Sequence, residues 1–195
     1  MQEKLTLSDK TFFSMIYAIY KWLFSQSFDI HIYIPAWTQP RNIAGIIRTA
    51  TIMGYHVHIG PSSKYARLIA KHRDTIEHCV MGANNYHVVV DMLSYLQTRK
   101  HIIIMESQEF WDSRNEVAYS IYDVPKYSEY TLVFGDEGLG IPSEFWKNIG
   151  TYIACYIPQS SSAKNTRNNT ERNHVSFNLN SAATLSMGIL TALHR

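Results

Sequence analysis

The stretch TLVFGDEGLGIP, residues 131–142, decides the fold of this chain. Its first residues are apolar or β-branched and predict a buried strand. Three glycines then break the pattern, and Pro142 followed by Ser143 indicates the start of a helix. Glycine has no Cβ, so a ligand can approach the backbone N–H and C=O groups of such a turn directly. Cofactors bind at turns of this kind, at the carboxyl ends of strands in open α/β sheets, although many similar turns are only tight connections.

Short apolar runs alternate with longer helical patterns along the rest of the chain. This alternation predicts βαβ units, and therefore an α/β fold with a mostly parallel sheet and helices on both faces. The runs expected to be strands are Asp29–Pro35, His56–Gly60, His87–Val90, His101–Met105, Thr131–Gly135 and Tyr152–Pro158. The segments expected to be helices are Arg41–Met53, Lys64–Glu77, Asp91–Arg99, Ser143–Lys147 and Asn180–Leu193.

The composition is that of a globular protein with a substantial core. The chain has 195 residues, of which 46% are hydrophobic and 17% are charged, and this length suits one α/β domain with a short extension. The net charge of +2 is too small to indicate a nucleic-acid partner by itself. Cys79 and Cys155 are far apart and have no metal-ligand spacing, so we expect no zinc site, no disulfide framework and a reducing, cytoplasmic environment.

Two segments differ from the central domain, which we expect over residues 29–195. Residues 1–28 are predicted to form an N-terminal helical extension. Its apolar part, Phe12–Phe24, contains Lys21 and is shorter than the roughly 20 residues that span a bilayer. We interpret it as a buried or dimer-contacting helix rather than a signal peptide, with no membrane association. Residues 160–174 form a polar insert, either functional or disordered.

Two further segments place polar residues beside apolar ones. In PRNIAGIIR, residues 40–48, the spacing of the isoleucines predicts a helix with one face on the sheet. Arg48 in this helix is either a functional residue or an ordinary solvent-facing arginine. In HVSFNLNSAA, residues 174–183, four polar side chains crowd a helix start, and a cap needs only one or two of them.

Together the three segments resemble the SpoU/TrmH family of SPOUT methyltransferases. The first is similar to the family motif N-x-x-A/G-x-x-R, and the second to G-x-E-x-x-G. The third resembles I-P followed by S-L-N-x-S-x-A, although here the stretch from Gln159 to Val175 separates its two parts. Phe177 stands in place of the usual leucine, and Asn180 in place of a common serine. The matching positions are Asn42, Arg48, Gly135, Glu137, Gly140, Ile157, Pro158, Ser176, Asn178 and Ala182.

The resemblance implies an enzyme that methylates the ribose 2′-oxygen of tRNA or rRNA with S-adenosylmethionine and without a metal ion. It also implies a C-terminal trefoil knot and a homodimer whose subunits share the substrate site. A catalytically silent RNA-binding relative that keeps the knot is the alternative. The residues expected to bind the cofactor are Met105, Gly135, Gly140, Ile157, Ser176 and Phe177.

The same resemblance assigns catalytic roles to Asn42, Arg48, Glu137, Ser176 and Asn178. Arg48 would deprotonate the ribose hydroxyl. A charge clamp on the phosphate and the developing alkoxide is equally compatible, because a guanidinium stays protonated in proteins. Glu137 would orient either Arg48 or the motif backbone, while Ser176 and Asn178 would supply hydrogen bonds around the cofactor and the ribose.

The spacing of three basic residues predicts an RNA-binding surface. Lys64, Arg67 and Lys71 recur at helical intervals and would lie on one face of the helix expected at Lys64–Glu77. Such a stripe would contact phosphates without reading their sequence. An ordinary solvated helix face is the alternative.

Overall fold

The computed structural model describes residues 28–60, 85–159 and 177–194, and within these residues seven strands form one sheet. The strand order is β3-β2-β1-β6-β4-β7-β5, and every pairing between neighbouring strands is parallel. The predicted parallel sheet is therefore confirmed. The strands are β1 (Asp29–Ile34), β2 (His56–Ile59), β3 (Tyr86–Val88), β4 (Ile102–Met105), β5 (Tyr119–Ser120), β6 (Glu129–Phe134) and β7 (Ile153–Tyr156).

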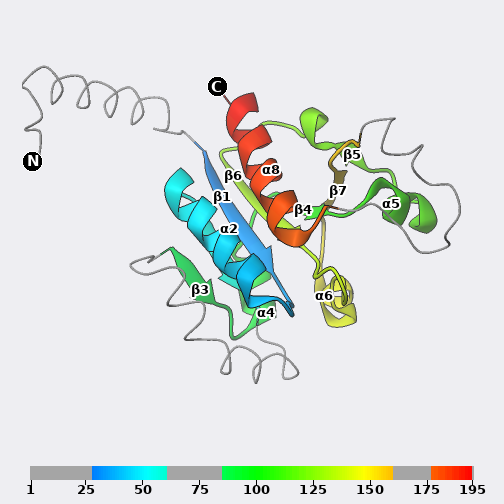
Figure 1. Cartoon of the computed structure of the whole chain (residues 1–195). Coiled ribbons are helices and arrows are strands. Elements are labelled where there is room, and N and C mark those ends of the chain that lie inside the picture. Colours follow the sequence, from blue (N-terminus) through cyan, green and yellow to red (C-terminus); the bar gives the residue numbers. More distant parts are fainter. Residues whose placement is uncertain (1–27, 61–84, 160–176, 195) are drawn as a thin grey trace, which may run out of the picture.

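Helices cover both faces of this sheet (Figure 1). The long helices α2 (Pro40–Met53) and α8 (Leu179–Leu193) lie side by side on one face. Three shorter helices contribute buried side chains to the core on the other face. They are α4 (Met92–Gln97), α5 (Gln108–Arg114) and α6 (Ser143–Asn148), and a single 3-10 turn, η1 (Ile121–Asp123), follows β5.

The central strands divide their side chains between the two cores with the period of two expected for a strand. In β1, Ile30 and Ile32 pack in the core under α2 and α8, whereas Tyr33 belongs to the core of the other face. In β6, Leu132 and Val133 are divided in the same way. Both faces are buried, which explains why these strands read as continuous apolar runs.

The ends of the two long helices follow from local chemistry. Pro40 stands at the start of α2, where its fixed φ fits the first turn and its missing N–H costs nothing. Gly54 ends that helix with a φ of 80°, in the left-handed region that glycine adopts without strain. Asn178 precedes α8, and its side-chain oxygen accepts a hydrogen bond from the Ser181 N–H.

Several predicted boundaries need correction. The strand expected at His101–Met105 begins at Ile102, because His101 has a φ of 48°. The edge strand expected at His87–Val90 is Tyr86–Val88. Helix α5, β5 and the 3-10 turn were not predicted, since they span only 7, 2 and 3 residues and offer too little periodic pattern.

Several predicted elements lie outside the described residues: the N-terminal helical extension, the helix at Lys64–Glu77 and most of the polar insert. The path from β7 to α8 runs through that insert, so the trefoil knot stays a prediction. Among the described helices, none has the length and apolar character required to cross a membrane.

The strand order brings one group of loops together. The chain runs from β1 outward through β2 and β3 and later returns to place β4 on the other side of the sheet, with β6 between β1 and β4. The loops that follow β4, β6 and β7 therefore meet at one carboxyl edge of the sheet. Ligands of open α/β sheets bind at such an edge, where the strand order reverses.

Candidate active site

The glycine-rich loop after β6 is tied to the loop after β1 by one buried carboxylate. Asp136 is only 3% exposed. Its Oδ2 accepts hydrogen bonds from the backbone N–H of Thr38 at 2.7 Å and from the Thr38 hydroxyl at 2.8 Å. Its Oδ1 accepts from the N–H groups of Gly138 at 3.0 Å and Leu139 at 3.2 Å. This carboxylate therefore fixes both the shape of the loop and its position on the sheet.

Two glycines of the loop are required by its geometry. Gly140 has a φ of 62°, a conformation that favours glycine. Its N–H donates to the Asp136 carbonyl at 2.7 Å, which closes the loop on itself. A Cβ at Gly135 would lie 2.8 Å from the Gly140 carbonyl carbon and 2.9 Å from the Ile141 nitrogen. A larger residue at Gly135 would force this turn open.

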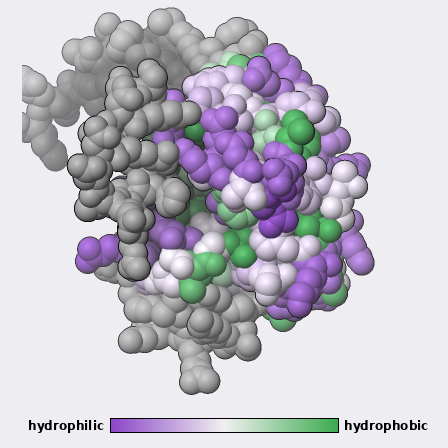
Figure 2. All heavy atoms as spheres, turned by 90° about the vertical axis from the view of Figure 1, so that its right-hand side faces the viewer, coloured by the Kyte–Doolittle hydropathy of each residue, from purple (hydrophilic) through white to green (hydrophobic). Residues whose placement is uncertain are grey.

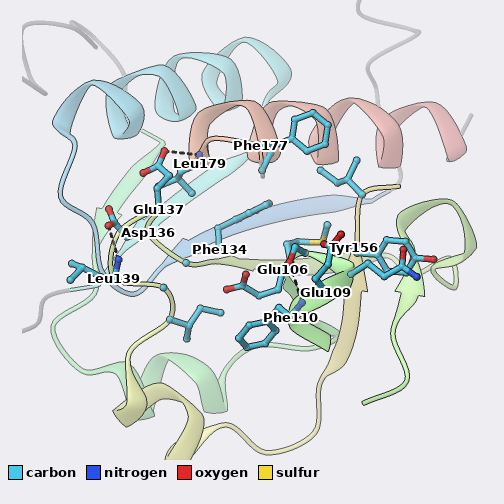
Figure 3. A pocket seen from close by; sticks show the side chains of 18 of the residues that line it. Glu106, Glu109, Phe110, Phe134, Asp136, Glu137, Leu139, Tyr156, Phe177 and Leu179 are labelled. Atoms are coloured by element: carbon cyan, nitrogen blue, oxygen red, sulfur yellow. Dashed lines mark hydrogen bonds between the residues drawn. The ribbon is translucent and has the colours of Figure 1, made fainter. Parts of the chain in front are cut away.

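Glu137 joins the three segments singled out in the sequence. Its Oε1 accepts a hydrogen bond from Asn42 Nδ2 at 2.7 Å. The same atom accepts one from the Leu179 backbone N–H at 2.8 Å (Figure 3). Asn42 comes from the first turn of α2 and Leu179 from the first turn of α8. One carboxylate thus holds two helix N-termini beside the glycine loop, an arrangement that the positive ends of both helix dipoles favour.

A cavity of about 630 Å³ opens beside this junction, at the carboxyl ends of β4, β6 and β7 (Figure 3). Five of the six residues predicted to bind the cofactor line it, and Ser176 lies outside the described residues. The five are Met105, Gly135, Gly140, Ile157 and Phe177. Side chains with large aromatic rings also contribute to the wall: Phe110, Phe134, Trp146 and Tyr156.

Arg48 and Asn178, two of the residues predicted to be catalytic, do not line this cavity. Arg48 is exposed on α2, with no hydrogen bond or ion pair to any residue that the structure describes. Asn178 caps α8, as described above. Glu137 accepts from the Asn42 side chain and from the Leu179 backbone N–H; the role assigned to it in catalysis stays a prediction. The basic stripe Lys64, Arg67 and Lys71 lies outside the described residues.

Glu106 is a cavity residue that the sequence analysis did not select. It directly follows β4, and burial raises the pKa of its carboxyl to about 7, an effect that the Ser107 backbone N–H only partly offsets. Its Oε1 lies 3.0 Å from the position that a Cβ on Gly135 would take. The sequence signal that could have identified Glu106 is its position, since it is an acid placed immediately after an apolar strand of a parallel sheet.

A second group of ionisable side chains lies away from the cavity, on β1, β2 and β3. His31 Nδ1 lies 2.9 Å from His58 Nε2, and His31 Nε2 lies 3.3 Å from Asp29 Oδ2. His56 and His87 stack beside them. Burial, together with neighbouring positive groups, lowers the pKa of His58 to about 3. Within the part of the chain that the structure describes, no three His, Cys, Asp or Glu side chains are arranged to hold a metal ion.

Fold and site together define an α/β protein with a cavity formed by the loops after β4, β6 and β7 and by the start of α8. The chain belongs to the SpoU rRNA Methylase family, which matches residues 29–187. The predicted family is therefore confirmed, and with it the class of RNA methyltransferase. The sequence has no match among curated proteins.

Solved structures share this fold at low sequence identity. One, described as giving insights into "the 2-OH methylation of C/U34 on tRNA", is 16% identical with a TM-score of 0.54, and the match covers 82% of this chain and 92% of that one. The AdoMet-bound rRNA methyltransferase from Sinorhizobium meliloti is 17% identical with a TM-score of 0.54, over 83% of this chain and 55% of that one. The SpoU methyltransferase AviRb from Streptomyces viridochromogenes is 15% identical with a TM-score of 0.53, and the match covers 86% of this chain and 60% of that one.

Proposed function

We propose that this protein transfers the methyl group of S-adenosylmethionine to a ribose 2′-oxygen of tRNA or rRNA. The observation that carries the proposal is the junction at Glu137, where Asn42, the glycine loop and the start of α8 meet beside the cavity. Support comes from the family and from the AdoMet-bound relative. The similar structure concerned with 2-OH methylation on tRNA favours the ribose as acceptor.

The residues of the cavity fit this cofactor. Aromatic and apolar side chains suit the adenine ring, and the glycine turn exposes backbone groups that can hydrogen-bond a ligand. S-adenosylmethionine supplies a methyl group already activated by its sulfonium, so the protein has to orient the ribose hydroxyl in line with the methyl carbon. The rigid loop around Asp136 and the bridge at Glu137 provide fixed positions for that purpose.

Arg48 would act on the substrate side of the site. Its guanidinium stays protonated, so it suits a clamp on the adjacent phosphate and on the oxygen as that oxygen loses its proton. Ser176 would supply hydrogen bonds around the cofactor and the ribose, as would Asn178, whose side chain caps α8. From the family we further propose that the chain forms a C-terminal knot and works in the cytoplasm as a homodimer. Exposed Arg48 would then be completed by RNA or by the partner subunit.

Methyl transfer to purified RNA tests the proposal. Wild-type protein incubated with total tRNA or rRNA and labelled S-adenosylmethionine should produce 2′-O-methylated nucleotides, located by mapping of the modified positions. Arg48→Ala should reduce turnover by about 100-fold, the loss expected when one charge-stabilising group is removed, while S-adenosylmethionine affinity stays within about twofold because Arg48 lies outside the cavity. The exposed neighbour Arg41→Ala is the matched control.

Two results would contradict the proposal. Turnover of Arg48→Ala equal to wild type would remove that residue from the mechanism. RNA binding by a folded wild-type protein that does not bind S-adenosylmethionine in calorimetry would favour the catalytically silent relative.

Charge reversal of Lys64, Arg67 and Lys71 should reduce the salt dependence of RNA binding by roughly one unit of slope per lost phosphate contact.

A further inference from the structure

The charges around the cavity all have the same sign. Among the described residues that line it, four are acidic and none is lysine, arginine or histidine. The Asp136 carboxylate accepts hydrogen bonds from the glycine loop and from Thr38. The Glu137 carboxylate accepts them from Asn42 and Leu179. Because these two carboxylates serve the protein itself, the carboxylate that faces a ligand from the cavity wall is that of Glu106.

Glu106 is the carboxylate built into the cavity wall. Its own backbone N–H donates to the Cys155 carbonyl at 3.1 Å, which extends the β4–β7 pairing and fixes the residue in place. Its side chain enters the cavity against Gly135 (Figure 3), where only the absence of a Cβ leaves room for it. No cation among the described residues forms an ion pair with it. A carboxyl that is largely buried without a protein cation is unfavourable when ionised, unless a ligand supplies the positive charge.

The surrounding surface indicates what kind of ligand that is. Aromatic rings and Met105 make the cavity suited to an aromatic group, and the negative wall suits a cation. On the face shown in Figure 2, hydrophilic residues cover most of the described surface and hydrophobic ones occur in small groups. The cavity is therefore where a ligand that is both aromatic and cationic would find matching chemistry.

We propose that Glu106 recognises the sulfonium charge of S-adenosylmethionine and makes the cavity select the methyl donor over its product. This inference rests on the proposed function. During transfer a bond forms between the ribose oxygen and the methyl carbon, and the bond between methyl carbon and sulfur breaks. The electron pair stays on sulfur and the hydroxyl proton leaves to solvent. S-adenosylhomocysteine is then neutral at sulfur, so its attraction to Glu106 falls and its release is favoured.

Calorimetric titration with the two nucleosides tests the selection. Wild-type protein should bind S-adenosylmethionine more tightly than S-adenosylhomocysteine. Glu106→Gln keeps the size of the side chain and removes its charge, and it should weaken S-adenosylmethionine binding by about tenfold, as for loss of one charge-assisted contact, while S-adenosylhomocysteine binding changes by less than about threefold. Glu144→Gln, which removes an exposed charge on α6 outside the cavity, should change neither.

Three outcomes would overturn the proposal. Equal weakening of both nucleosides would mean that Glu106 holds a group common to them, such as a hydroxyl or the amino group. Unchanged selectivity in Glu106→Gln would remove the carboxylate from recognition. Equal affinity of the wild-type protein for S-adenosylhomocysteine and S-adenosylmethionine would also contradict the proposed selection. This measurement needs no variant, so it holds even if Glu106→Gln does not fold. The proposed function fails separately, when the wild type binds neither nucleoside.

Discussion

The half of the sheet formed by β1, β2 and β3 and the half formed by β6, β4 and β7 both bury ionisable side chains, and they do so in different ways. In the histidine half, His31, His56, His58 and His87 lie on adjacent strands and contact one another. In the pocket half, Glu106 faces a cavity and has no cation beside it among the described residues. His58 is 8% exposed and its pKa is lowered to about 3, whereas the pKa of Glu106 is raised to about 7.

Burial disfavours the charged form of both groups, but only one of the two environments leaves space for a ligand. The neutral imidazole of His58 finds its partner within the protein, at His31, so its burial stabilises the strand packing at neutral pH. The carboxyl of Glu106 is kept in a cavity of about 630 Å³. A perturbed pKa next to a cavity is typical of a functional site, whereas a perturbed pKa inside a packed cluster is as often structural.

The largest effect is expected at Asp136, which shapes the pocket half. Asp136→Ala should lower the free energy of unfolding by about 4 kcal/mol, because hydrogen bonds to a charged group are worth about 1.5–3 kcal/mol each and the abandoned N–H groups lose their acceptor. Urea denaturation at pH 7 measures this change. Thr38→Val removes only the hydroxyl contact and should cost about 1 kcal/mol. Equal losses in the two variants would show that the loop N–H groups find other partners.

In the histidine half we expect a smaller effect that depends on pH. The folded pKa of His58 is below its ordinary value of 6.5, so the unfolded chain binds the proton first and stability falls as pH drops below 6.5. The slope for one such group approaches about 1.4 kcal/mol per pH unit. Between pH 7 and 5 the wild type should therefore lose about 2 kcal/mol more than His58→Gln, which cannot titrate. Parallel stability curves for the two proteins would contradict this.

His87→Gln is the matched control for that measurement. His87 is an exposed member of the same cluster and only a minor cause of the lowered pKa of His58, so its replacement should change the slope much less than His58→Gln does. The other charged or titratable groups near His58 are present in all three proteins; they are Asp29, His31, His56 and Arg99.

The sequence predicted the parts of the molecule that depend on local pattern. The apolar runs Asp29–Pro35 and Thr131–Gly135 predicted two parallel strands, which the structure has at Asp29–Ile34 and Glu129–Phe134. The glycines after Phe134 predicted the ligand loop. The partners of Asp136 and Glu137 were not predictable, since Thr38 and Asn42 are far away in the chain and meet them only after β1 and β6 pair. Helix α5 was missed because its strongest sequence signal is a single capping residue, Ser107. The side chain of Ser107 accepts a hydrogen bond from the Phe110 N–H.

Glu106 should show the smallest effect on stability, with a pH dependence opposite to that of His58. Its folded pKa is above the ordinary value of 4.5, so the folded protein holds the proton longer than the unfolded chain. The stability that comes from this carboxyl is complete below pH 4.5 and is lost as pH rises through about 7. Glu106→Gln mimics the protonated form, so it should match the wild type at pH 5 and exceed it at pH 8. We expect a gain of about 1 kcal/mol, since partial exposure of Glu106 reduces the penalty. Denaturation of the ligand-free proteins at the two pH values measures it. A difference that does not change with pH would mean that water or a cation from outside the described residues already stabilises the carboxylate, and the contrast between the two halves of the sheet would then be lost.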